Sequence, residues 1–346
     1  MGTSITASLA ICLAACSLIC CGPAPQSRTA EKKVIKKSEE SVAPEVSLPR
    51  ADQKLVAELK QSVHALSHKI GERNTKKHWE LAAAADFIAD QLTAAGYEVG
   101  RQGFEVDDVI AQNLEVDVRG TERGDEVLVV GAHYDSAPGS PGADDNASGT
   151  AALLSLARQF RELKLRRSVR FVFFANEEPP YFQTDRMGSV MYAKHALARG
   201  DRMVGMLSLE SLGVFSDAKD SQRYPAELRE KHPTTGNFIA VVSDTASAGL
   251  CRRFAKLMQE GGPVPVEHDA LPGDLPGVGW SDHWAFWQIG VPAVMVTDTA
   301  PFRSAHYHKA TDTADRLDYE RMAHVVVSLS RSLRELANQP ALPPRE

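Results

Sequence analysis

Short apolar runs that alternate with helical patterns restrict the fold of this 346-residue chain more than any other feature. Residues 127–132 (VLVVGA) and 171–175 (FVFFA) carry no charged side chain, which is typical of strands buried on both faces of a parallel sheet. Apolar residues recur at helical spacing in residues 148–163 and 188–200. The alternation predicts an α/β fold, a single three-layer domain in which helices cover both faces of a mostly parallel, mixed central sheet.

The same patterns extend over residues 51–340, which we interpret as one domain because they contain no internal repeat. Further strands are expected in residues 97–106, 113–120, 203–215, 237–244 and 292–300. Further helices are expected in residues 53–69, 79–95, 247–261 and 319–338. Residues 179–189 and 267–280 are interpreted as loops that shape a substrate pocket.

The N-terminus has the composition of an export signal. Residues 1–21 contain no charged side chain, and their apolar stretch is too short to span a membrane. This stretch leads into Leu13–Cys16 (LAAC), which resembles a bacterial lipobox, so we expect cleavage before Cys16 or, alternatively, before Cys21. An ordinary secretory signal and a misassigned start codon are the other interpretations.

Residues 22–50 are rich in Pro, Ser, Lys and Glu and are expected to form a disordered linker. We therefore expect an exported cell-envelope protein, held on the membrane by an N-terminal lipid and facing the periplasm or the outer membrane, and otherwise a secreted one. Cys251 is the only cysteine of the domain, which excludes an intradomain disulfide. The net charge of −6 gives no reason to expect a nucleic-acid partner.

Side chains that could bind a metal follow the predicted strands. Because ligands bind at the carboxyl ends of the strands in such sheets, these side chains are expected to converge. Each one alone could instead cap a helix or face solvent, but Glu210 lies inside an apolar run, where an unpaired carboxylate is costly. The candidates are His133, Asp135, Asp144, Asp145, Glu177, Glu178, Glu210, His306, Tyr307 and His308.

The donor types of this set favour zinc, because imidazoles and carboxylates occur together without a thiolate. Two histidines and three carboxylates can hold two ions if one carboxylate bridges them, as is common in aminopeptidases. The HExxH pattern of single-zinc peptidases is absent. The G-x-S-x-G pattern of serine hydrolases is absent as well.

Five segments resemble the zinc-dependent M28 peptidases: GAHYDS, PGADDNASG, FFANEEPP, MLSLESLG and AHYHKATDTADRLDY. They occur in the family's order, and the resemblance spans residues 53–338. It implies the zinc exopeptidase fold, also described as phosphorylase/hydrolase-like, with a peptide substrate and two zinc ions per chain.

The resemblance also implies a role for each motif residue. His133 and Glu210 would bind one zinc, Glu178 and His308 the other, and Asp145 would bridge both ions. Glu210 stands where the family commonly has aspartate, which changes the geometry of that ligand. The resemblance further implies a cis peptide bond between Asp145 and Asn146.

The implied mechanism uses Glu177 as the general base and acid that deprotonates a metal-bridged water and then protonates the leaving amine. Tyr307 would assist at the oxyanion, and Asp135 would orient the ligand His133. Asp282 and His283, in the segment GWSDHWAFW, resemble a further motif near the substrate pocket.

The leading functional hypothesis is a di-zinc aminopeptidase. Carboxypeptidase or dipeptidase activity also occurs in the family. A glutaminyl-peptide cyclotransferase shares the fold but typically uses one zinc, and the presence of both His133 and Glu210 argues against it. A non-catalytic binding protein on the same fold is the remaining alternative.

Overall fold

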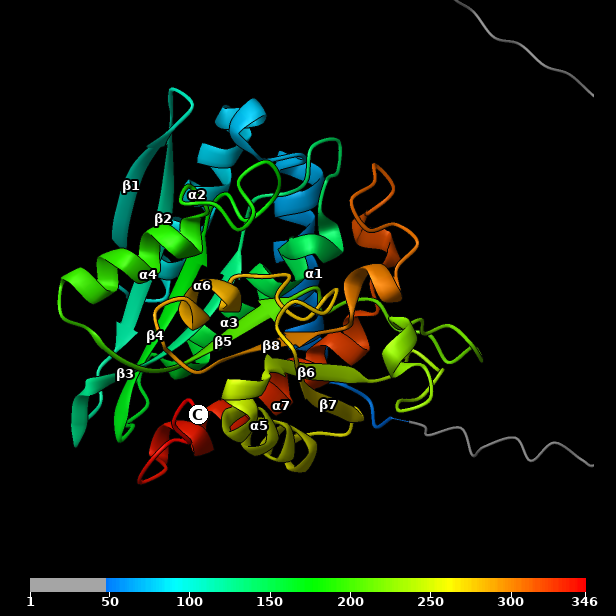
Figure 1. Ribbon diagram of the computed structural model, residues 1–346. Helices are drawn as coiled ribbons and strands as arrows, with labels where there is room; N and C mark the ends of the chain where they lie inside the picture. The colour runs from blue at the N-terminus through cyan, green and yellow to red at the C-terminus, as the bar shows by residue number, and fades with distance from the viewer. Residues whose placement is uncertain (1–47) are drawn as a thin grey trace, which may run out of the picture. The chain divides into compact units, whose positions relative to one another are not determined.

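The computed structural model describes residues 48–346, and its centre is an eight-stranded sheet (Figure 1). The export signal, the lipobox and most of the linker expected from the sequence lie outside the described residues. The strands are β1 (Gly100–Val106), β2 (Val109–Val118), β3 (Arg123–His133), β4 (Arg167–Phe174), β5 (Arg202–Glu210), β6 (Ile239–Asp244), β7 (Val266–Leu271) and β8 (Ala293–Thr297).

The order of the strands brings the carboxyl ends of β4, β3, β5 and β8 together at one edge of the sheet. Across the sheet they run β1-β2-β4-β3-β5-β8-β6-β7. β4, β3, β5 and β8 are mutually parallel, whereas β1, β2 and β6 each pair antiparallel with a neighbour. The chain leaves β3 for β4 on one side and later returns to β5 on the other. This reversal makes the end of β3 the switch point where ligands bind in such sheets.

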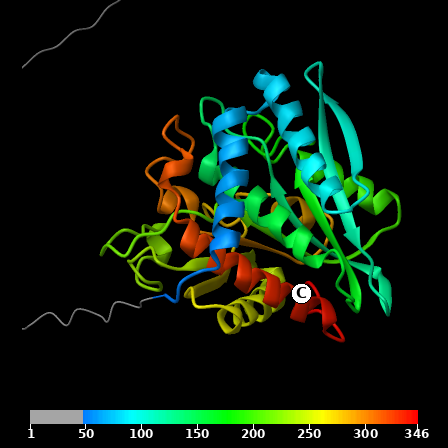
Figure 2. The same ribbon diagram turned by 180° about the vertical axis from the view of Figure 1, so that it is seen from behind.

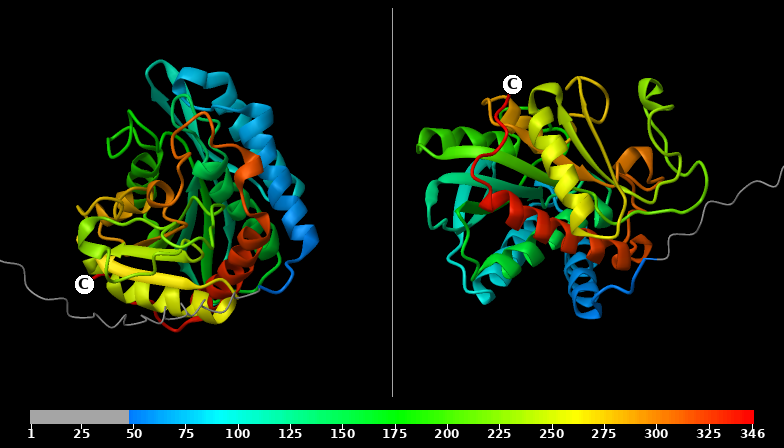
Figure 3. Two further views of the ribbon diagram at one scale, coloured as in Figure 1. Left: turned by 90° about the vertical axis from the view of Figure 1, so that its right-hand side faces the viewer. Right: turned by 90° about the horizontal axis from the view of Figure 1, so that it is seen from below.

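Helices cover both faces of the sheet, as the apolar strands require. They are α1 (Gln53–His64), α2 (His78–Ala94), α3 (Gly149–Phe160), α4 (Gly188–Ala198), α5 (Ala248–Gly261), α6 (His283–Trp287) and α7 (Tyr319–Asn338). In β3, Leu128 and Val130 belong to the core that contains α1, α2, α3, α5 and α7, while Val127 and Val129 belong to the core that contains α4 and α6. Figure 2 shows the first layer from outside, and Figure 3 shows the sheet from its edge and from below.

The predicted three-layer α/β fold with a mixed sheet is confirmed. The interpretation of residues 267–280 as a loop was wrong at its start, because β7 occupies Val266–Leu271. β7 pairs only with β6 at the edge of the sheet, and edge strands tolerate charged residues that interrupt an apolar pattern. Within residues 48–346, no helix has the length and apolar character needed to cross a membrane.

Candidate metal centre

Three neighbouring strands deliver the candidate metal donors to one edge of the sheet. His133 is the last residue of β3, Glu210 is the last residue of β5, and Glu177 and Glu178 follow the end of β4. His133 pairs in register with Phe174, the last residue of β4. The parallel register therefore places the two glutamates beside His133, as the sequence predicted.

The first group of donors surrounds Nε2 of His133. Oε2 of Glu210 lies 3.1 Å from this nitrogen, and Oδ1 of Asp145 lies 3.3 Å from it. All three side chains are buried, with residue exposures of 1–5%. Together they form a cluster of three residues that could hold one ion.

The second group surrounds Nε2 of His308. Oδ2 of Asp145 and Oε2 of Glu178 each lie 3.1 Å from it. Asp145 thus presents one carboxylate oxygen to each group, which is the arrangement of a bridging ligand. His308 is half-buried, so this group lies nearer to solvent than the first.

The donor distances fit zinc. Atoms bound tetrahedrally to one zinc through bonds of about 2.0–2.2 Å lie roughly 3.3–3.5 Å apart. The observed distances from each histidine nitrogen to the two carboxylate oxygens of its group are 3.1–3.3 Å. Oε1 of Glu178 is buried and has no hydrogen-bond partner among residues 48–346, so an uncompensated acceptor faces the same space.

Burial and mutual repulsion shift the pKa values of these side chains. Burial, reinforced by the charge of Asp145, raises the pKa of Glu178 to about 8. Burial disfavours the charged form of His133, but the carboxylates of Glu210 and Glu177 outweigh it and raise the His133 pKa. The pKa of Asp145 falls because hydrogen bonds from both histidines outweigh its burial. The cluster thus gathers more carboxyl groups than imidazoles, and a divalent cation would favour the ionised form of each carboxyl group.

Glu177 differs from its neighbour in belonging to neither group. Its Oε2 lies 4.0 Å from Nε2 of His133, farther than any of the other donor contacts. Burial is the main cause that raises the pKa of Glu177, and the charges of Glu178 and Glu210 add to it. Glu177 is therefore a buried carboxylate, beside the two donor groups, that is free to exchange a proton.

Asp135 fixes the segment that carries both glutamates. Its Oδ1 accepts the backbone N–H of Glu177 and its Oδ2 accepts that of Glu178, each at 3.1 Å. Oδ1 also lies 3.3 Å from Nδ1 of His133, although this pair lacks the alignment of a hydrogen bond. The orienting role beside His133 stays a prediction, whereas the two hydrogen bonds show that Asp135 anchors the backbone of the glutamate pair.

The loop that carries Asp145 is held from two sides. Oδ1 of Asp312 accepts the backbone N–H of Asp144 at 2.9 Å, and its Oδ2 accepts that of Asp145 at 3.2 Å. The amide of Asn146 donates to the carbonyl of Leu209, next to the ligand at the end of β5, at 2.8 Å. The peptide bond between Asp145 and Asn146 is cis, as the family resemblance implied.

A fully buried arginine ties these loops together. The guanidinium of Arg73 donates to the backbone carbonyls of Tyr134, Pro141, Gly142 and Gly71. It forms no ion pair with a side chain of residues 48–346. Its guanidinium instead binds backbone carbonyls at both ends of the segment that connects His133 with Asp145.

Asp144 is buried and His306 half-buried, and neither lines the cavity that contains the donors. The other candidates divide between that cavity and the core. Tyr307 lines the metal cavity, and its ring stacks on that of His308 with centroids 3.8 Å apart. Asp282 and His283 are fully buried and do not line that cavity. Instead their neighbour Ser281 donates its hydroxyl to Oε2 of Glu210 at 2.8 Å.

Sequence reasoning missed Asp312, Arg73 and Ser281. Asp312 lay within a quoted motif, four residues after His308, so its carboxylate was a usable signal. Arg73 follows a predicted helix directly, where a buried cation is not expected. Its partners lie 61 to 69 positions away in sequence, apart from Gly71, and no spacing rule connects them.

Sequence comparisons place these residues among known proteins. The family model described as "Peptidase family M28" matches residues 113–331. The uncharacterized protein YfbL of Escherichia coli K12 is 36% identical over 278 residues, covering 78% of this chain and 84% of YfbL. Aminopeptidase YwaD of Bacillus subtilis is 40% identical over 201 residues, covering 57% of this chain and 38% of YwaD. The match therefore spans less than two thirds of YwaD.

Solved structures share the fold at lower sequence identity. BSAP, a zinc aminopeptidase from Bacillus subtilis, superposes with a TM-score of 0.66 at 15% identity, covering 85% of this chain and 97% of BSAP. The Fimbriiglobus ruber glutaminyl cyclase superposes with a TM-score of 0.59 at 21% identity, covering 81% of this chain and 94% of the cyclase. The fold alone thus accommodates two different reactions.

Proposed function

The chain belongs to peptidase family M28 and is a zinc-dependent metallopeptidase, and we propose that it is an aminopeptidase that works with two zinc ions. The observation that carries this proposal is the pair of donor groups that share Asp145 and leave Glu177 outside both. His133, Asp145 and Glu210 would hold one ion, and Asp145, Glu178 and His308 the other. The named aminopeptidases among the relatives and neighbours support the same substrate class.

When bound, two zinc ions would supply a nucleophile at neutral pH and an electrophile for the peptide carbonyl. The chain's own contribution begins with Glu177, whose buried carboxylate accepts a proton and later donates it to the leaving amine. Asp135 keeps this carboxylate in place through the backbone N–H of Glu177. Burial raises the pKa of Tyr307, so its hydroxyl stays protonated and can donate a hydrogen bond to a developing oxyanion.

The experiment that tests this proposal is hydrolysis of a panel of aminoacyl amides by protein treated with a chelator and then reloaded with zinc. We expect activity to disappear on chelation and to return fully only at about two zinc ions per chain. Full activity at one ion per chain would contradict the two-ion arrangement. If the enzyme hydrolysed no aminoacyl amide and removed only C-terminal residues from peptides, it would be a carboxypeptidase instead.

A glutaminyl-peptide cyclotransferase is the second candidate, because glutaminyl cyclases share the fold. The first donor group, which adds His133 and Glu210 to the shared Asp145, favours the peptidase. An enzyme with one zinc needs only the other group. A peptide with N-terminal glutamine separates the two: loss of ammonia without release of an amino acid would establish the cyclase.

We also propose that the chain is exported as a lipoprotein, on the basis of the lipobox-like Leu13–Cys16. Cys16 would carry the lipid, and Cys21 is the alternative. Mass spectrometry of the membrane-bound protein decides between them: Cys16→Ala should abolish lipid attachment, whereas Cys21→Ala should leave it intact. A mature N-terminus without lipid would support simple secretion.

A further inference from the structure

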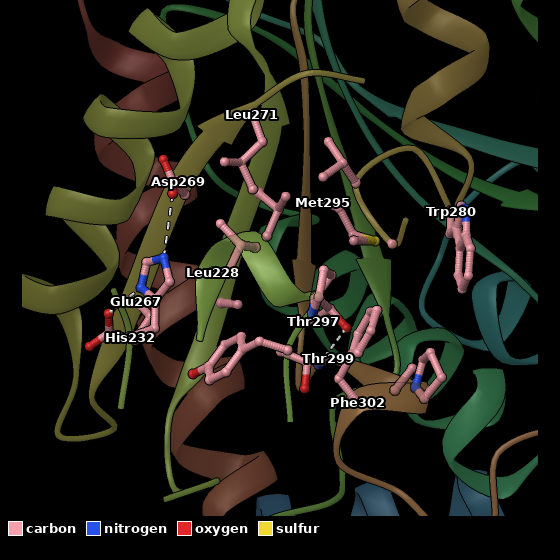
Figure 4. Close-up of a pocket in the computed structure, with 18 of the residues that line it drawn as sticks. Leu228, His232, Glu267, Asp269, Leu271, Trp280, Met295, Thr297, Thr299 and Phe302 are labelled. Carbon is pink, nitrogen blue, oxygen red and sulfur yellow. Dashed lines mark hydrogen bonds and ion pairs between the residues drawn. The ribbon is translucent and has the colours of Figure 1, made fainter. Parts of the chain in front are cut away.

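A cavity of about 100 Å³ adjoins the metal centre (Figure 4). Its lining shares Glu210, Trp280 and Tyr307 with the cavity that contains the metal donors. A peptide whose first bond lies at the donors would therefore place a neighbouring side chain in this second cavity. The cavity thus selects among substrates by the side chain that it accepts.

The strand register gives the distance between the two ends of the cavity, measured between the strand backbones that carry Glu210 and Glu267. Glu210 of β5 pairs with Thr297 of β8, Thr297 pairs with Ala240 of β6, and Ala240 pairs with Glu267 of β7. Directly paired residues project to the same face of a sheet, so both glutamates point to the side on which the cavity lies. Three strand spacings of about 4.8 Å place their backbones roughly 14 Å apart. A side chain that extends from the metal centre toward Glu267 must therefore be long.

The wall between the two ends is apolar. Leu228, Leu271 and Met295 lie between the metal-centre end, marked by Trp280, and the far end (Figure 4). Leu228 and Leu271 belong to the core on the α4 and α6 side of the sheet. Such walls suit a stem of methylene groups, which gains free energy when it leaves water.

The far end is acidic. His232 lies between two carboxylates, with Nδ1 3.2 Å from Oε2 of Glu267 and Nε2 3.4 Å from Oδ2 of Asp269. No lysine or arginine is among the described residues that line the cavity. The only lining side chains that can carry a positive charge are His232 and His268. Two carboxylates thus line the cavity with a single imidazole in contact with them, which favours a cation and disfavours an anion.

We propose that this cavity binds the side chain of an N-terminal lysine or arginine, so that the enzyme prefers peptides with a basic first residue. The inference rests on the proposed aminopeptidase function. The apolar wall receives the stem, and Glu267 and Asp269 receive the cationic head through charge-assisted hydrogen bonds. Acidic first residues are rejected by the same two carboxylates.

The test compares lysyl with norleucyl amides, since norleucine has a similar stem without the charge. We expect kcat/KM to be roughly tenfold or more higher for the lysyl amide, as for a hydrogen bond to a charged group. In the double variant Glu267→Gln with Asp269→Asn, this ratio should fall close to one, because the neutral amides no longer favour the cationic head. A ratio of one or below in the unmodified enzyme would overturn the proposal, as would an equal loss for both amides in the variant.

A binding measurement separates this proposal from the proposed function. Free L-lysine and L-norleucine are titrated calorimetrically into the zinc-loaded protein, and lysine should bind roughly tenfold or more tightly. Tighter lysine binding by a protein that cleaves no aminoacyl amide would refute the aminopeptidase function and retain the pocket. Cleavage of norleucyl amides with equal binding of the two amino acids would retain the function and refute the pocket.

Discussion

Asp312 supports Asp145 from beneath the loop that carries it, with Oδ2 of Asp312 3.2 Å from the backbone nitrogen of Asp145. Asp135 makes the same kind of contact with the other donor-bearing segment, accepting two consecutive backbone N–H groups at Glu177 and Glu178. Asp312 and Asp135 are not proposed as ligands, but they fix the backbone of the two segments that carry proposed ligands. Such outer contacts orient metal ligands and determine how tightly the ion is held.

Asp312→Asn should therefore weaken zinc binding without removing a ligand. Asparagine keeps one acceptor oxygen but turns an N–H donor toward one of the two backbone N–H groups. We expect zinc affinity to fall about 10- to 100-fold, measured by competition with a chelator of known affinity. Asp315→Asn is the matched control, because Asp315 is exposed and undergoes the same change of charge. Equal affinity in the two variants would contradict the role of Asp312.

The two adjacent glutamates should respond differently to the same substitution. Glu177→Gln should keep both zinc ions but lower kcat by about 10²- to 10⁴-fold, because only proton transfer is removed. Glu178→Gln should lower the zinc content, because an oxygen of the second donor group is lost. Metal analysis of both variants beside kcat checks this. Loss of zinc from Glu177→Gln would make Glu177 a ligand instead.

Replacement of Arg73 should destabilise the protein strongly. Arg73→Met leaves several backbone carbonyls without their donor, and each such loss costs about 1–3 kcal/mol. We expect the free energy of unfolding in urea to fall by about 3 kcal/mol or more, and zinc affinity to fall with it. Lys77→Met, at an exposed position on the same segment, is the control and should change little. A stability equal to that of the control would show that the carbonyls are satisfied in another way.

Metal-free protein should lose stability as pH rises from about 6.5 to about 8. Burial, with the charge of Asp145, raises the pKa of Glu178 from 4.5 to about 8. Burial opposes the charge of His308, but hydrogen bonds to Asp145 and Glu178 raise its pKa from 6.5 to about 10. In this window the folded state binds more protons than the unfolded state at both groups, so the unfolding free energy falls with pH.

Thermal unfolding of chelator-treated protein at these two pH values provides the measurement. The melting temperature should be lower at the higher pH, and zinc should raise it more there, since ligand deprotonation favours the ion. A melting temperature of the metal-free protein that rises with pH across this window would contradict the assigned shifts.

Local pattern was sufficient to predict the central strands and a set of candidate donors, whereas the family resemblance implied which of them are ligands. β3 and β4 were recognisable because strands buried on both faces are apolar throughout, and the carboxylates directly after them stood out. β7 was not recognisable, because an edge strand has one neighbour and can carry residues such as Glu267 and Asp269. The acidic end of the second cavity could therefore not be predicted from the sequence.

The sequence by itself determined the alternation of strands and helices and the identity of the donor side chains, because both depend on residues close together in the chain. Only the tertiary structure decided that Asp145 faces His133 with one oxygen and His308 with the other. It also places Glu177 outside both donor groups and Glu178 in one of them. These relationships depend on the order and register of strands separated by long connections, and no local propensity encodes them.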